Sequence, residues 1–172
     1  RDRSVSRGLG DVYKRQECIS LKEIELPTTL TDIKNGAFQN CWSLASIQIP
    51  DNVTTISQSS FYHCTSLIQV KFPTKLKSIS NSAFQECSAL TKINLPEGVL
   101  TISSNAFYQC SALEEISFPS TLTTLGSTAF YHCSNLTEIT LPASLTYCYH
   151  PFYECHNIKK LSLIHISEPT RH

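Results

Sequence analysis

The chain has 172 residues, with 14 Lys and Arg against 14 Asp and Glu, so its formal net charge is zero. This balance removes the main electrostatic reason to expect a nucleic acid or an anionic membrane as the partner. Hydrophobic residues make up 41% of the chain, which is too many for a disordered protein. No run approaches the roughly 20 apolar residues of a membrane-spanning helix, so we expect no membrane span in this sequence.

Charge is unevenly distributed along the chain, because every arginine lies within the first 15 residues or at residue 171. Between residues 17 and 163 there are 8 Lys against 11 Asp and Glu, for a net charge of −3. This shift in composition predicts boundaries near residues 16 and 164. We therefore expect a tail over 1–16, one folded domain over 17–163 and a second tail over 164–172.

A period of 23 residues runs through the central part of the chain. Proline, cysteine and phenylalanine each recur at this step, so three residue types share one register. A unit of this length cannot bury its own apolar groups, whereas stacked units share a continuous core. The period therefore predicts a repeat solenoid. Its proline and cysteine columns are Pro27, Pro50, Pro73, Pro96, Pro119 and Pro142, and Cys18, Cys41, Cys64, Cys87, Cys110 and Cys133.

Each unit contains three short pieces in chain order. Alternating apolar residues, as at Leu44, Ile47 and Ile49, predict a strand, and the proline that follows ends its ladder. A second apolar pair, such as Val53 and Ile56, predicts another brief extended piece. Phe and Cys three residues apart in [AS]-F-x-x-C predict a single helical or 3₁₀ turn facing the core. We expect a core of Leu and Ile columns and one aromatic stack: Phe38, Phe61, Phe84, Phe107, Phe130 and Phe152.

The motifs L-x-x-I-x-[LI]-P and [AS]-F-x-x-C, as in Leu136–Pro142 and Ala129–Cys133, resemble the BspA-type leucine-rich repeats. The resemblance covers residues 17 to about 163. It implies a leucine-rich-repeat solenoid, α/β in class but rich in β-structure. About six to seven coils would stack short parallel strands, turns and single-turn helical pieces.

The same resemblance implies a non-enzymatic protein–protein interaction module from a cell-surface protein of the adhesion type. Its partner would then be a host matrix protein or another cell-surface protein, and its location extracellular or at the cell surface. An intracellular or generic interaction scaffold of the same fold, without an adhesive role, fits the residues equally well. A signal peptide or a cell-wall sorting segment in the full-length gene would separate these two hypotheses.

The two tails fit no position of the repeat, and they resemble adapter-derived translations that contaminate metagenomic assemblies. This interpretation rests on three observations: the tails join the repeat abruptly, they contain every arginine of the chain, and the chain lacks Met. The alternative is a natural linker at each end. We expect the tails to be disordered or artefactual and the chain to be a fragment of a longer protein.

Six of the eight cysteines share one column. Neighbours in such a column have parallel Cα–Cβ vectors, which disfavours disulfide bonds, so we predict buried thiols that act as small apolar groups. The last unit lacks one residue and gathers Cys148, His150, Cys155 and His156, a set that zinc would accept. Their spacing fits no standard zinc finger, and two of them fill repeat columns. We therefore predict neither a metal site nor a cofactor.

The sequence contains no nucleophile elbow, P-loop, zincin motif or C-x-x-C motif. His63 and His132 precede column cysteines. Sequence neighbours on one turn, however, do not form the Cys–His couple that nucleophilic catalysis requires. We predict no catalytic residues and no enzymatic activity.

Alternation through each predicted strand turns two residues per coil outward. The resulting face is mixed in charge, and each of its strands is short. Such a face suits a protein partner better than a polyanion. Lys71 and Lys92 lie between acidic residues of earlier and later coils, which predicts a charge pattern along the strands. The predicted partner-binding residues are Glu23, Glu25, Gln48, Lys71, Lys92, Asn94, Glu115 and Glu138.

A second ladder follows the core phenylalanines and carries tyrosine in four coils. Tyrosine is enriched at binding hot spots because it combines a large apolar area with a polar tip. Packing between coils is the alternative and the favoured one, since Tyr after Phe is common in the resembled family. Trp42 lies where other coils have Ser or Thr, so it either covers an end of the stack or is an exposed anchor. The ladder consists of Tyr62, Tyr108, Tyr131 and Tyr153.

Overall fold

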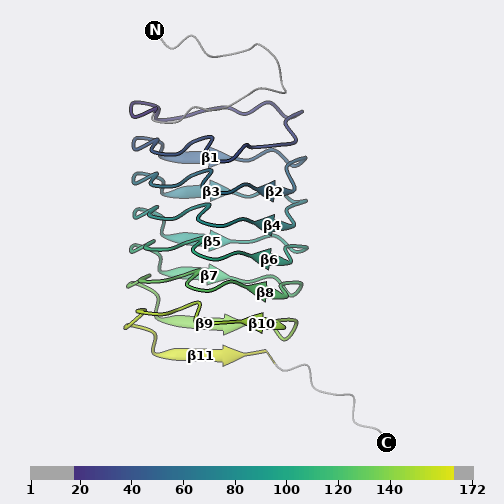
Figure 1. Cartoon of the computed structure of the whole chain (residues 1–172), viewed down its shortest axis with the longest axis vertical. Helices are drawn as coiled ribbons and strands as arrows, with labels where there is room; N and C mark the ends of the chain where they lie inside the picture. The colour runs from purple at the N-terminus through teal and green to yellow at the C-terminus, as the bar shows by residue number, and fades with distance from the viewer. Residues whose placement is uncertain (1–17, 165–172) are drawn as a thin grey trace, which may run out of the picture.

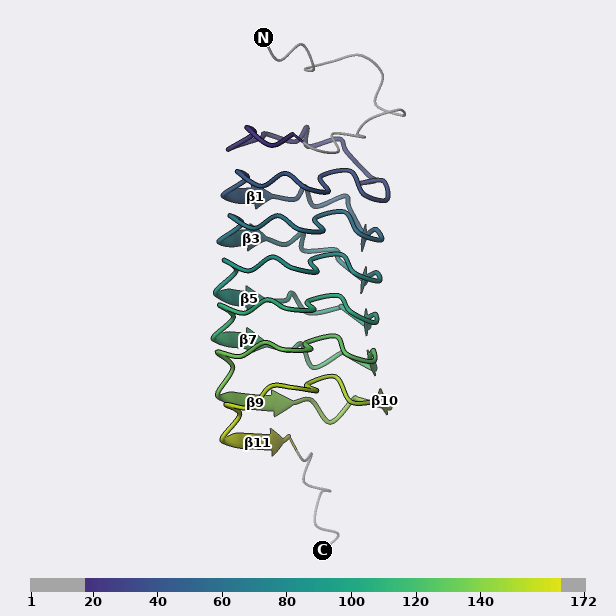
Figure 2. The ribbon, with the colours of Figure 1, turned by 60° about the vertical axis from the view of Figure 1, so that its left-hand side comes forward.

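The computed structural model describes residues 18–164, which form one continuous stack of coils (Figures 1 and 2). Most coils contribute one short strand to each of two ladders, which run along the axis of the stack. Apart from Ile164, both predicted tails lie outside the described residues, as does Glu17. The predicted domain boundaries therefore stay predictions.

The first ladder, here called the strand face, occupies the positions predicted from L-x-x-I-x-[LI]. The second ladder, here called the second sheet, occupies the positions of the second apolar pair. All strand pairs in both ladders are parallel. The strand face contains β1 (Ser46–Gln48), β3 (Gln69–Lys71), β5 (Lys92–Asn94), β7 (Glu115–Ser117), β9 (Glu138–Leu141) and β11 (Lys160–Leu163). The second sheet contains β2 (Thr55–Ile56), β4 (Ser78–Ile79), β6 (Thr101–Ile102), β8 (Thr124–Leu125) and β10 (Tyr147–Cys148).

The strand face is divided into three pairs of strands, β1 with β3, β5 with β7, and β9 with β11 (Figure 1). The ladder is interrupted between β3 and β5, and again between β7 and β9. Both breaks directly follow a phenylalanine: Phe72 and Phe118 stand where the other complete coils have Ile49, Leu95 and Leu141. We attribute the breaks to these larger side chains.

The two phenylalanines pack edge-on against the core phenylalanine of the coil that follows. The ring centroid of Phe72 lies 5.7 Å from that of Phe84, with the rings at 76°. Phe118 lies 5.8 Å from Phe130, at 84°. An aromatic ring fills more volume than Leu or Ile at the same position, and a packed core transmits that difference to the backbone. The strands on either side of each ring are therefore too far apart to form a ladder.

The second sheet, in contrast, is continuous from β2 to β10. Its register joins equivalent residues of successive coils, and Ile33 extends it by one isolated bridge to Ile56. The inward side chain is Ile or Leu from Ile33 through Leu125, and all of these are buried. Because the buried column is uniform in size, nothing separates one strand from the next.

The predicted aromatic core is confirmed. Phe38, Phe61, Phe84, Phe107 and Phe130 are at most 1% exposed. Neighbouring rings of this column stack face to face, with centroids 5.1–5.3 Å apart and interplanar angles of 2–9°. The sixth predicted member, Phe152, stacks on Phe130 at 5.4 Å but is only partly buried, because it lies in the last coil described.

The predicted single-turn helical pieces are turns, and no helix occurs among residues 18–164. Successive amides around Phe61 donate alternately within the turn and to the next coil. Phe61 N–H donates to Ala83 O at 2.8 Å and His63 N–H to Gln85 O at 2.8 Å, whereas Cys64 N–H donates back to Phe61 O at 3.3 Å. A helix needs consecutive amides for its own ladder. Here every second amide donates its hydrogen bond to the neighbouring coil instead.

The column cysteines are thiols and not disulfides, and those from Cys41 to Cys133 are buried, as predicted. Each thiol from Cys64 onward also donates a hydrogen bond to the carbonyl oxygen of the phenylalanine in the preceding coil. The distances are 3.1 Å from Cys64 Sγ to Phe38 O and 3.1 Å from Cys87 Sγ to Phe61 O. The thiols therefore bind successive turns together as well as filling space.

Candidate interaction surface

The eight predicted partner-binding side chains are all exposed and all lie on the strand face or on its extension to residues 23–25. The predicted alternation is confirmed, since the central residues of β1 and β5 are buried between exposed neighbours. The residues fall into two columns that run along the stack. One column contains Glu23, Lys92, Glu115 and Glu138, and the other contains Glu25, Gln48, Lys71 and Asn94.

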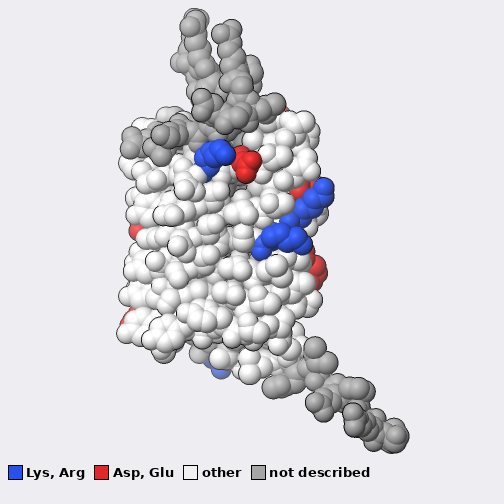
Figure 3. Space-filling model, turned by 45° about the vertical axis from the view of Figure 1, so that its right-hand side comes forward, with Lys and Arg blue, Asp and Glu red and all other residues white. Residues whose placement is uncertain are grey.

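Charged side chains concentrate on this side of the molecule. Of the 18 charged side chains in residues 18–164, 10 lie in the two columns or in the column just before them. The side that carries the second sheet is mostly uncharged (Figure 3). Because the backbone repeats while these side chains differ from coil to coil, the strand face presents a specific charge pattern on a regular support.

The structure brings together one pair of predicted residues. Lys92 Nζ lies 3.1 Å from Glu115 Oε1 in the next coil, in the register that pairs β5 with β7. Both side chains remain more than half exposed, at 57% and 66%. Lys71 lies on the other side of the first break and forms no ion pair with any described residue. Lys71 is thus the more available of the two predicted lysines.

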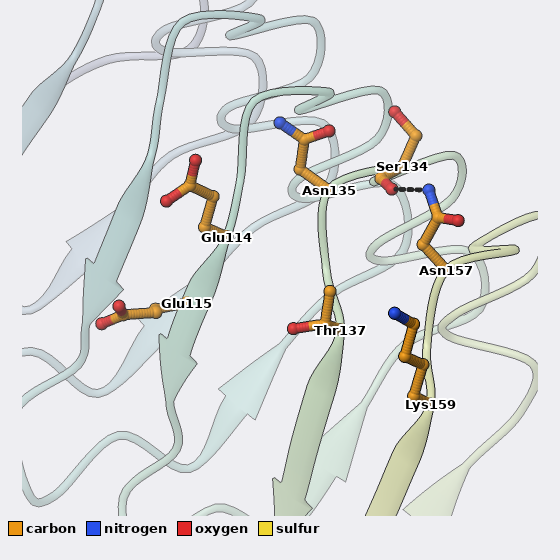
Figure 4. A pocket seen from close by; sticks show the side chains of 7 residues that line it. All are labelled: Glu114, Glu115, Ser134, Asn135, Thr137, Asn157 and Lys159. Carbon is orange, nitrogen blue, oxygen red and sulfur yellow. Dashed lines mark hydrogen bonds between the residues drawn. The ribbon is translucent and has the colours of Figure 1, made fainter.

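A depression of about 450 Å³ opens at the second break, beside Glu115. Figure 4 shows the carboxylates of Glu114 and Glu115 on one side, Lys159 on the other and Thr137 between them. The rim is completed by Ser134, Asn135 and Asn157, whose side-chain amide donates to Ser134 O at 2.7 Å. The depression therefore has an acidic wall and a basic wall drawn from three coils.

The break also leaves backbone groups available in the depression. Glu114 N–H donates to Thr91 O at 2.9 Å, and Lys159 N–H donates to Thr137 O at 2.8 Å. No hydrogen bond among the described residues joins Thr137 N–H to Glu114 O, the equivalent pair across the break. Sequence reasoning identified only Glu115 among the lining residues. The substitution of Phe118 for Leu was the signal for the break, but its effect on the ladder could not be read without packing geometry.

A second, smaller depression of about 270 Å³ lies on the turns. It brings His63 and His132 into one groove, with Glu86 between them, and His63 Nε2 lies 3.7 Å from Glu86 Oε2. The adjacent Cys64 thiol is buried, and burial raises its pKa well above the usual range, with smaller contributions from Cys87 and Cys41. A nucleophilic thiolate at this position is therefore strongly disfavoured.

The tyrosine ladder packs between coils, which is the alternative that the sequence favoured. Tyr108 and Tyr131 stack with ring centroids 4.5 Å apart, and Tyr131 and Tyr153 follow at 5.8 Å. Tyr62 donates to Glu86 Oε1 at 3.4 Å. Trp42 is 46% exposed, so it does not cover the end of the stack, and its ring edge lies against His63 at 6.1 Å.

The cysteines and histidines of the last coil are dispersed among other interactions. Cys155 Sγ donates to Phe130 O at 2.9 Å, and His156 Nε2 lies 2.6 Å from Glu154 Oε2, while Cys148 is exposed. Within residues 18–164 no three His, Cys, Asp or Glu side chains are grouped so that they could hold a metal ion. The same residues include no helix of the length and apolarity that crossing a membrane requires.

Comparison with known proteins identifies the repeat. The model of the BspA type leucine rich repeat region matches in six copies over residues 13–111 and 79–168. A leucine-rich-repeat protein of T. pallidum (TpLRR) is similar, with a TM-score of 0.72, 30% identity, and coverage of 74% of this chain and 60% of that chain. No curated protein matches.

Two further solved structures extend the comparison. A leucine-rich-repeat protein of Eubacterium ventriosum has a TM-score of 0.69 at 28% identity, covering 87% of this chain and 39% of that one. The pneumococcal vaccine antigen PcpA has a TM-score of 0.59 at 28% identity, covering 70% of this chain and 29% of that one. The chain thus spans between 29% and 60% of the length of these three proteins. With the repeat model matching along nearly its whole length, the chain belongs to the BspA-type leucine-rich-repeat family.

Proposed function

We propose that this chain is part of a cell-surface protein of the adhesion type and that its strand face binds a partner protein. The family and the fold support a protein-interaction repeat module. The observation that favours the strand face is its charge pattern, which differs from coil to coil on a repeating backbone. The similarity to a pneumococcal vaccine antigen supports an exposed location.

The partner would be recognised by local charge complementarity, since the chain has no net charge to attract one class of polyion. Lys71, which forms no ion pair among residues 18–164, offers an ammonium group near the centre of the stack. The depression at the second break offers Glu114 opposite Lys159. An extended protein segment with acidic and basic residues in the complementary order would fit both places. Matrix proteins of a host are the expected partners.

The test compares two double variants of the full chain against immobilised matrix proteins by interferometry. Lys71→Glu with Lys92→Glu reverses two charges on the strand face. Lys75→Glu with Lys77→Glu is the matched control, because it makes the same charge change away from that face. We expect only the first variant to weaken binding, and to weaken it more at low salt, because rim charges act mainly on the association rate.

Circular dichroism of both variants checks that the solenoid is intact. Equal binding by the wild type and the strand-face variant would contradict the proposed surface. Loss of binding in Tyr108→Ala and Tyr131→Ala alone would assign the site to the tyrosine ladder instead. The surface location is tested separately, by recovering the full-length open reading frame and looking for an export signal.

A further inference from the structure

The second sheet presents one outward column of hydroxyl groups in strict register. Its members are equivalent residues of β2, β4, β6, β8 and β10, and each pairs with the next along the ladder. The hydroxyls of the first two members lie 3.0 Å apart. Parallel strands recur about every 4.8 Å, so these positions do too. Neighbouring hydroxyls can lean toward one another, as those of Thr55 and Ser78 do in the hydrogen bond that joins them. The column consists of Thr55, Ser78, Thr101, Thr124 and Tyr147.

A second small-residue column runs beside the first, on the other side of the buried Ile and Leu residues. It consists of Ser57, Ser80, Ser103, Gly126 and Tyr149. Both columns therefore end in tyrosine in the last coil of the sheet, where Tyr147 is 53% exposed and Tyr149 is 58% exposed. Apart from the buried Gly126, the surface changes from small hydroxyl-bearing side chains to two exposed aromatic rings along a single direction.

The five strands of this sheet carry almost no charge, and the charged residues Asp32 and Lys34 lie beyond β2, beside the bridging residue Ile33. In the five strands and the residues that flank them, over 54–57, 77–80, 100–103, 123–126 and 146–149, Lys77 is the one charged residue. Figure 3, turned so that this side comes forward, shows a mostly uncharged face on which a few charged side chains stand out. The surface thus lacks the fixed charges that would select an anionic polymer. Hydroxyl groups both donate and accept hydrogen bonds, so the ladder matches a partner that is itself rich in hydroxyls.

We propose that the second sheet binds an uncharged, extended β-1,4-linked glycan, which lies along the axis of the stack. The linkage keeps such a chain straight enough to follow a continuous sheet, and because successive rings are turned over, one face of the chain repeats every second ring, over about the length of two coils. The apolar face of one sugar ring stacks on Tyr147, whose exposed ring offers apolar area beside a polar tip, whereas the ring of Tyr149 already lies 4.5 Å from that of His150. This binding site is distinct from the strand face and does not depend on the proposed function.

The experiment is calorimetric titration of the full chain with cellohexaose. Maltohexaose, an α-1,4-linked isomer that curls, controls for shape, and a hyaluronan hexasaccharide controls for charge. We expect cellohexaose to bind measurably more tightly than either. Tyr147→Ala should weaken binding by about tenfold through loss of the stacked ring. Thr101→Val, which keeps the side-chain shape and removes one hydroxyl, should weaken it by about threefold.

Tyr153→Ala is the matched control, because Tyr153 is 56% exposed but belongs to the tyrosine ladder, and we expect it to bind like the wild type. The proposal is overturned if cellohexaose does not bind, if maltohexaose or hyaluronan binds as well, or if Tyr153→Ala loses as much affinity as Tyr147→Ala. Circular dichroism monitors folding. Should Tyr147→Ala fail to fold, the affinity of Thr101→Val for cellohexaose decides, and an affinity equal to that of the wild type would overturn the proposal.

The two proposed binding sites can be tested independently of each other. The Lys71→Glu, Lys92→Glu variant should keep its affinity for cellohexaose, and Tyr147→Ala should keep its affinity for a matrix protein. A variant that lost both activities while remaining folded would contradict the separation of the two surfaces.

Discussion

The two ladders of the solenoid are built from the same repeat but differ in continuity and in charge. The second sheet is one uninterrupted five-stranded sheet with an almost neutral surface, whereas the strand face is divided into three pairs and holds most of the charged side chains. The buried column behind the second sheet is uniformly Ile or Leu through Leu125. The column behind the strand face contains Phe72 and Phe118. We infer from the difference that side-chain volume at one column decides whether a ladder stays continuous.

The largest effect is expected in the aromatic core that both ladders share. Phe84 is fully buried and stacks on Phe61 at 5.1 Å and on Phe107 at 5.2 Å. Phe84→Ala should lower the free energy of unfolding by about 3–5 kcal/mol, because it removes a buried ring and leaves a cavity. Denaturant melts of the two proteins measure the loss. Phe152→Ala, at the partly buried end of the same stack, should cost less; a loss below about 1 kcal/mol for Phe84→Ala would mean that the column is not the core.

A smaller effect is expected where the second sheet is tightest. Gly126 N–H donates to Ile102 O at 2.7 Å, and a Cβ atom at Gly126 would run into the backbone of Ser103 and Ser104. Gly126→Ala should therefore destabilise the protein by about 1–3 kcal/mol through overpacking. Ser103→Ala, in the same column, is the control and should change stability by no more than about 0.5 kcal/mol. Equal free energies of unfolding for Gly126→Ala and the wild type in denaturant melts would show that the coils can move apart here, as they do on the strand face.

The next prediction tests the cause of the breaks directly. Phe118→Leu gives this coil the residue that other coils have, so β7 and β9 should close into a ladder. The free energy of unfolding should change by no more than about 1.5 kcal/mol, because a new hydrogen bond offsets the lost apolar area. The amide of Thr137 should exchange with solvent about tenfold more slowly once it bonds to Glu114 O. Amide hydrogen exchange read by NMR measures this protection.

Phe72→Leu is the matched variant at the first break. It should protect amides between β3 and β5 and leave Thr137 unchanged. Unchanged exchange at Thr137 in Phe118→Leu would contradict the assignment of the break to the phenylalanine. Closure should also narrow the depression that Glu114 and Lys159 line, which would weaken any partner anchored there.

The periodic features of the fold could be predicted from the sequence because each recurs in every coil. The positions of Phe61 and Cys64 fix an inward column, and the alternation around Ile47 fixes an outward face. The turn between Phe and Cys was misjudged as helical, since a spacing of three residues suits a helix and a turn equally. What distinguishes them is the hydrogen bond from Phe61 N–H to Ala83 O in the next coil, which depends on the tertiary structure.

The candidate sites depend on departures from the period, which are harder to predict. Exposure of Lys71 and Glu115 follows from alternation alone. The pairing of Lys92 with Glu115 needs the register and the side-chain conformation. The depression beside Glu114 needs a break whose cause, Phe118, looks like an ordinary apolar substitution in the sequence. Whether these residues bind a partner stays a prediction.

The smallest effect on stability is expected for the ion pair on the strand face. Lys92 and Glu115 are 57% and 66% exposed, so water screens their attraction and both long side chains lose freedom when they pair. Lys92→Gln should therefore change the free energy of unfolding by no more than about 0.5 kcal/mol in denaturant melts. The same substitution should weaken binding of a matrix protein at low salt if the strand face is the interaction surface, since it alters the charge pattern there. A change in stability above about 1 kcal/mol would indicate instead that Lys92 and Glu115 hold β5 and β7 together, and that their charges serve the fold rather than a partner.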